Sequence, residues 1–217
     1  MEYSERLTRL ERFYEEGRLV RNDWGDGEEC ACLLAALFPE TSDPEFRGNR
    51  CAAVPRDVMP PWAAPMVMEL ADHAESSSWP RTQQRFVRVA RALPRLDDTH
   101  WFSVRKRFLA NALEAAGRAV LRRDEPEYLA VLTDVANVLR GDPTYMPRAL
   151  LEQRVGALRV TFDGVRASAV VRLMGLVRDA YRDPARATHV YVTSGVAFPE
   201  IGECFLSALE EQCALAA

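Results

Sequence analysis

The chain has 217 residues, of which 48% are hydrophobic and 28% are charged, a composition typical of a globular protein and unlike a disordered or fibrous one. Its formal net charge of −4 gives no overall attraction to nucleic acid or to an anionic membrane. The longest apolar run, residues 30–38, has nine residues and is too short to cross a bilayer. With five cysteines and no apparent secretion signal, we expect a cytoplasmic protein with reduced thiols and no membrane association.

The first elements predicted along the chain are helical. Apolar residues between Tyr3 and Tyr14 recur at every third or fourth position, which indicates a helix that ends at Gly17. A second, short helix is expected over residues 28–38. Residues 39–55 are rich in proline, glycine, asparagine and aspartate and predict a loop.

The remainder of the chain continues the helical pattern. Further helices are expected from near Pro65, over 80–93, from Asp97 or Asp98 to Val120, over 124–139, 147–159 and 165–182, and from Pro199 onward. Residues 141–147, GDPTYMP, interrupt this series and mark a possible subdomain hinge.

One stretch differs from the helices, because residues 188–198 alternate like a strand and are rich in β-branched and aromatic side chains. It would pair at most with residues 158–162 in a small two-stranded ribbon, or lie as an extended loop over the helices. The predicted fold is therefore mainly α: an irregular multi-helix bundle of about eight helices in a single domain, 1–217.

The segment GDGEECACLLAALFPE, residues 25–40, raises the question of a reactive thiol. With Asp26 or Gly27 as the cap, Cys30 would lie in the first turn of the 28–38 helix, where the positive helix end lowers a thiol pKa. A nucleophilic cysteine also needs a base, and His189 is the candidate.

This order, a cysteine that opens a helix and a distant histidine on a predicted strand, loosely resembles papain-like cysteine peptidases and related acyltransferases. The resemblance covers EECACLLAAL and THVYV and implies a hydrolase or acyltransferase that uses Cys30 or Cys32 with His189. The aromatic residue that the family carries directly after its cysteine is missing. The adjacent Glu28 and Glu29 would raise the pKa of Cys30, so we favour two small apolar residues in a helix.

No metal site or cofactor is predicted. Cys30, Cys32, Cys51 and His73 would supply four nitrogen and sulfur ligands, but they lack the paired close spacings of a structural zinc site.

A stripe of arginines is the feature with the clearest consequence. No acidic residue occurs between Glu75 and Asp97, and the segment carries five arginines at intervals of four, three, three and four. They are Arg81, Arg85, Arg88, Arg91 and Arg95. This spacing aligns them on one helix face, where like charges repel unless something relieves them. Internal acids such as those of residues 1–16, solvent, or an external anionic partner would do so, and the RKR at 105–107 would extend the patch if the two helices are antiparallel.

Three functions follow from these features. We favour a non-catalytic protein that binds another macromolecule through the arginine face, with an acidic protein surface expected rather than nucleic acid. The thiol-dependent enzyme is the alternative. A second alternative is a helical protein that binds a small apolar ligand among Trp62, Met66, Met68, Trp79 and Trp101.

Overall fold

The computed structural model describes residues 1–21, 23–46, 49–120, 133, 136–137, 140 and 199–216. For His73, Leu113, residues 116–120 and residues 199–201 it describes the backbone only. The expected helices at 124–139, 147–159 and 165–182, the ribbon of 158–162 with 188–198, and the hinge at 141–147 lie outside the described residues, apart from isolated helical positions at 133, 136, 137 and 140.

The described part of the chain is mainly helical, as the sequence predicts. Its α-helices are α1 (Tyr3–Glu15), α2 (Leu33–Leu37), α3 (Ala63–His73), α4 (Trp79–Ala90), α5 (Asp98–Val120) and α10 (Pro199–Leu215). Short 3-10 helices are η1 (Pro39–Ser42), η2 (Pro44–Phe46), η3 (Arg50–Ala53) and η4 (Leu93–Arg95). Within the described ranges no helix is both long and apolar enough to cross a membrane.

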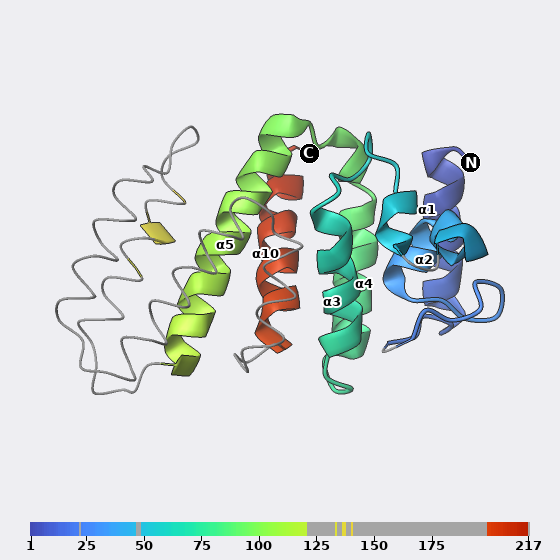
Figure 1. The fold of residues 1–217 in the computed structure, drawn as a ribbon, viewed down its shortest axis with the longest axis horizontal. Helices are drawn as coiled ribbons and strands as arrows, with labels where there is room; N and C mark the ends of the chain where they lie inside the picture. Colours follow the sequence, from blue (N-terminus) through green and yellow to red (C-terminus); the bar gives the residue numbers. More distant parts are fainter. Residues whose placement is uncertain are drawn as a thin grey trace.

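The helices lie side by side, with α10 in a central position. Figure 1 shows α10 between α5 and the pair formed by α3 and α4, and α1 and α2 lie on the far side of that pair. Ion pairs and hydrogen bonds between α4 and α10 follow increasing residue numbers on both helices, so the two run parallel. Residues more than a hundred positions apart therefore form one packed unit.

Apolar and aromatic side chains form the core between these helices. Phe205 of α10 is fully buried and packs edge-on against Trp62 and Phe108, with ring centroids 6.1 and 5.9 Å apart. Trp101 of α5 also packs edge-on against Trp62, with ring centroids 6.0 Å apart. Met66, another residue of the proposed apolar ligand pocket, is also fully buried in the core. These aromatic rings therefore use their contact area to hold α3, α5 and α10 together.

Two arginines of α1 anchor the segment that follows it. Arg6 forms a two-pronged ion pair with Glu40 of η1, at 2.5 and 2.7 Å, although its side chain is only 8% exposed. Arg9 donates to the carbonyls of Ala35 and Ala36 at the end of α2, at 2.7 and 2.6 Å. The last turn of a helix has unpaired carbonyls, and Arg9 satisfies two of them.

The helix expected over 28–38 is shorter than predicted, since it begins at Leu33 with Cys32 as its N-cap. The reason lies in Asp26, whose Oδ1 accepts hydrogen bonds from the backbone amides of Glu28, Glu29 and Cys30, at 2.8, 2.7 and 3.1 Å. These bonds hold the chain in a local turn and delay the helix. The predicted loop at 39–55 contains the three short 3-10 helices η1 to η3.

Candidate functional site

The five arginines of the predicted stripe come from two elements. The helix expected over 80–93 ends at Ala90, so Arg81, Arg85 and Arg88 lie on α4, Arg91 is its C-cap and Arg95 belongs to η4. Phe86, Val89 and Leu93 are buried as predicted, at 0%, 2% and 0% exposure. Val89, however, lines the same groove as the arginines and does not lie opposite them.

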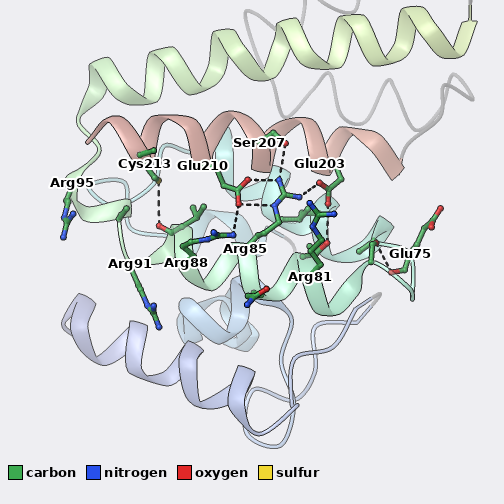
Figure 2. Close-up of a pocket in the computed structure, with 18 residues that line it drawn as sticks. Glu75, Arg81, Arg85, Arg88, Arg91, Arg95, Glu203, Ser207, Glu210 and Cys213 are labelled. Atoms are coloured by element: carbon green, nitrogen blue, oxygen red, sulfur yellow. Dashed lines mark hydrogen bonds and ion pairs between the residues drawn. The ribbon is translucent and has the colours of Figure 1, made fainter. Parts of the chain in front are cut away.

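All five arginines line one open groove between α4 and α10, which has a volume of about 990 Å³. Figure 2 shows how they surround it, with α10 along one side. Three glutamates, Glu75, Glu203 and Glu210, share the lining. Between the charges the lining consists largely of short side chains, among them Ala74, Ser78, Ala92, Ser207 and Ala214.

Arg85 is the best-connected member of the stripe. Its guanidinium meets the carboxylate of Glu210 through Nε and Nη2, at 3.0 and 2.8 Å, pairs with Glu203 through Nη1, and donates to the hydroxyl of Ser207 at 3.2 Å. The hydrogen bonds with Glu210 raise the pKa of Arg85 above its ordinary value, against the opposing effect of burial. The side chain is only 12% exposed. Arg85 therefore joins α4 to α10 and is already neutralised.

Arg88 and Arg91 are paired more loosely. Arg88 lies 3.5 Å from Glu210, which Arg85 already occupies, and its side chain is 68% exposed. Arg91 turns toward α1, away from α10, and its Nε donates to Glu11 at 2.8 Å while the side chain stays 60% exposed. An acidic residue of the segment 1–16 thus neutralises the stripe at one position, Arg91.

Arg81 and Arg95, at the two ends of the stripe, are exposed. Within the described ranges their guanidinium groups make no hydrogen bond or ion pair. Arg81 also lies in the first turn of α4, which has no acidic residue. A cation in that position opposes the helix dipole, so Arg81 does not stabilise its own helix.

The acidic residues of α10 are the part of the site that sequence reasoning missed. Glu203, Ser207 and Glu210 follow one another at intervals of four and three, and so do Arg81, Arg85 and Arg88. The matching intervals were a signal that the two helices pair along their length. The RKR segment does not extend the stripe: Arg107 pairs with Glu211 on the α5 side of α10, and within the described residues none of the three lines the groove.

The thiols do not form a reactive centre in the described structure. Cys30 precedes α2 rather than opening it, so the expected placement in a helix's first turn is wrong. Cys32 is buried, its sulfur accepts the backbone N–H of Ala35 at 3.4 Å, and burial raises its pKa to about 11. His189, the proposed base, lies outside the described residues.

Of the other two residues considered as metal ligands, Cys51 is described and the side chain of His73 lies outside the description. Burial raises the pKa of Cys51 to about 11, and its thiol contacts the sulfur of Met68 at 3.1 Å. In the part of the chain that the structure describes, no group of three histidine, cysteine, aspartate or glutamate residues is placed to hold a metal ion.

Comparison of the chain with models of known protein families, with curated protein sequences and with solved structures finds no match. The functional inference therefore depends on the geometry of the groove.

Proposed function

We propose that this protein is a non-catalytic cytoplasmic protein that binds an acidic segment of another protein in the groove between α4 and α10. The observation that carries the proposal is the row of three exposed arginines, Arg81, Arg88 and Arg95, along an open groove. Arginine is suited to this role because its planar guanidinium binds a carboxylate through two parallel hydrogen bonds. The cytoplasmic location is the expectation from the cysteine content.

The rest of the described surface favours binding through charge. Its exposed large hydrophobic residues are Met1 and Leu215, at 61% and 68%, and neither lines the groove. A docking surface among the described residues is therefore polar, and electrostatic complementarity would decide its partner.

The glutamates in the lining favour a protein partner over nucleic acid. Glu75, Glu203 and Glu210 lie among the arginines, and the chain as a whole is negative. Nucleic acid presents phosphates continuously, so its backbone would meet these carboxylates as well as the arginines. A protein can place single carboxylates at the arginines and leave the glutamates facing solvent or neutral groups.

The proposal can be tested with a fluorescein-labelled peptide of about 20 residues composed of glutamate and alanine, at about 0.15 M salt, by fluorescence anisotropy. The variant is Arg81→Ala with Arg95→Ala, which we expect to weaken binding by roughly fivefold to thirtyfold. The matched control is Arg12→Ala with Arg56→Ala, since both arginines are exposed and lie outside the groove lining. Both double variants lower the net charge equally.

The proposal is supported if Arg81→Ala with Arg95→Ala weakens peptide binding and the control double variant does not. If the two double variants weaken binding equally, the attraction is a general effect of charge and the groove has no special role. A single-stranded DNA of equal charge that binds more tightly than the peptide would favour a nucleic-acid partner instead.

A further inference from the structure

The groove also carries information on the shape of its occupant. If the groove binds an acidic segment, as the proposed function on which this inference rests requires, the conformation of that segment must fit the arginines. Two forms are possible in principle: an extended strand, or a helix that lies along α4.

The spacing of the arginines favours a helix. Arg81 and Arg88 are seven residues apart on α4, which is about 10.5 Å along the helix axis. Two carboxylates seven residues apart on a second helix have the same separation and the same face. A strand places same-face side chains about 6.8 or 13.6 Å apart, so it loses register with the arginines by about 4 Å or about 3 Å.

A helix of the protein itself already presents carboxylates to α4, but they converge on a single arginine and do not reproduce the seven-residue register. Glu203 and Glu210 of α10 are also seven residues apart, and both meet Arg85 from a helix that runs parallel to α4. The carboxylates of α10 thus contact the arginine face from one side, at Arg85. Arg81, Arg88 and Arg95 remain exposed, available to a second helix of the same character.

The lining between the charges permits close approach. Much of it consists of short side chains, among them Ala74, Ser78, Ala92, Ser207 and Ala214, and its longer uncharged members are Leu70, Gln84 and Val89. Alanine and serine keep the distance between helix backbones small, so a helix can lie deep enough for its carboxylates to reach the arginines. The long arginine stems add apolar contact area at the edges.

We infer that the partner segment is a helix with acidic residues seven positions apart on one face and small residues beside them, lying along α4. This is the helix-in-groove mode of recognition, with carboxylates in place of the usual large apolar anchors.

Three peptides of about 21 residues, or roughly 31 Å of helix, test the inference. The aligned peptide has glutamates at seven-residue intervals on an alanine and glutamine background. The scattered peptide has the same composition with the glutamates distributed around the helix. The broken peptide is the aligned sequence with central alanines replaced by proline, which prevents a continuous helix.

We expect the aligned peptide to bind the full chain at least about tenfold more tightly than the other two, as measured by isothermal titration calorimetry. The circular dichroism spectrum of the mixture should show more helix than the sum of the spectra of the protein and the peptide. Arg88→Ala should weaken the aligned peptide by roughly fivefold and leave the scattered peptide within about twofold.

The outcomes separate this inference from the proposed function. Equal binding of all three peptides would overturn the helical partner, while acidic binding in the groove would stand. If none of the peptides binds, the proposed function fails and the helical partner fails with it.

Discussion

Arg85 lies at the junction of α4 and α10, and replacing it with alanine tests how far this junction supports the fold. The substitution removes two hydrogen bonds to Glu210, the pairing with Glu203 and the bond to Ser207. It leaves two carboxylates facing each other without the cation between them. We expect Arg85→Ala to be the most destabilising change among the five arginines of the stripe.

The magnitude follows from the exposure of the three charged side chains. Breaking a fully buried ion pair costs about 3–5 kcal/mol, whereas an exposed pair is worth about 0–1 kcal/mol. Arg85 is 12% exposed, Glu210 29% and Glu203 43%, so water can rehydrate the two carboxylates once the cation is removed. A loss of about 2–3 kcal/mol in the free energy of unfolding is therefore expected, which corresponds to a drop in Tm of roughly 4–12 °C for a chain of this size.

The assay is thermal and urea denaturation at neutral pH, followed by circular dichroism. Arg81→Ala is the matched control, because it removes the same side chain from the same helix where the structure describes no partner. We expect it to change the free energy of unfolding by less than about 0.5 kcal/mol, or to raise it slightly, since it removes a cation from the first turn. A double-mutant cycle of Arg85→Ala with Glu210→Ala should give a coupling of about 1–2 kcal/mol.

If Arg85→Ala and Arg81→Ala have the same Tm within about 2 °C, the ion pairs of Arg85 do not stabilise the junction of α4 and α10. The relative cost of the two glutamates gives a second check. Glu210 is the less exposed and makes two bonds to Arg85, so Glu210→Ala should lower the stability more than Glu203→Ala. The reverse order would show that exposure does not govern these ion pairs.

Three further changes test the packing, the turn and the thiol. Gly25 has φ +73°, and a Cβ there would overlap the carbonyl oxygen of Cys30, whereas Gly17 has φ +67° with open space around it. In urea denaturation, Gly25→Ala should lower the free energy of unfolding by at least about 2 kcal/mol, and Gly17→Ala should lower it by about 1 kcal/mol. Phe205→Ala should cost about 3–5 kcal/mol because the ring is fully buried, and the fluorescence of the tryptophans beside it should shift toward that of exposed indole. Cys32 should resist iodoacetamide in the folded protein at pH 7.5 and react in urea, as mass spectrometry would show; rapid modification in the folded state would restore the thiol-dependent alternative. Its folded pKa of about 11 lies above the value of about 8.5 for an unfolded thiol, so the stability that it contributes is complete below pH 8.5 and declines as the pH rises toward 11.

The sequence predicted the described helices well wherever apolar spacing and proline acted together. Pro80 marks the start of α4, and the buried face of Phe86, Val89 and Leu93 was identified from spacing alone. The prediction was wrong at residues 28–32. Asp26 or Gly27 was expected to cap a helix there, but the carboxylate of Asp26 binds three backbone amides in a local turn and the helix begins at Leu33.

For the candidate site, the sequence predicted the arginine stripe and the need to neutralise its repulsion. It did not predict which acidic residues do so. Residues 1–16 were one expected source of acids, beside solvent or an external partner, and they contribute Glu11 to Arg91. Most of the compensation comes from Glu203 and Glu210, more than a hundred residues away. Spacing within one helix reveals which residues share a face, whereas the choice of neighbouring helix depends on the packing of the whole chain.

The central position of α10 has a consequence for how the protein is made. Residues 199–215 complete the core between α3, α4 and α5, yet the ribosome produces them about a hundred residues after α4. At about 5–20 residues per second, the faces that receive Phe205 and Leu209 stay uncovered for roughly 5–20 seconds in every round of synthesis. During that interval the nascent chain exposes apolar surface that is prone to aggregation. The yield of folded protein in the cell should therefore depend on chaperones that bind the growing polypeptide.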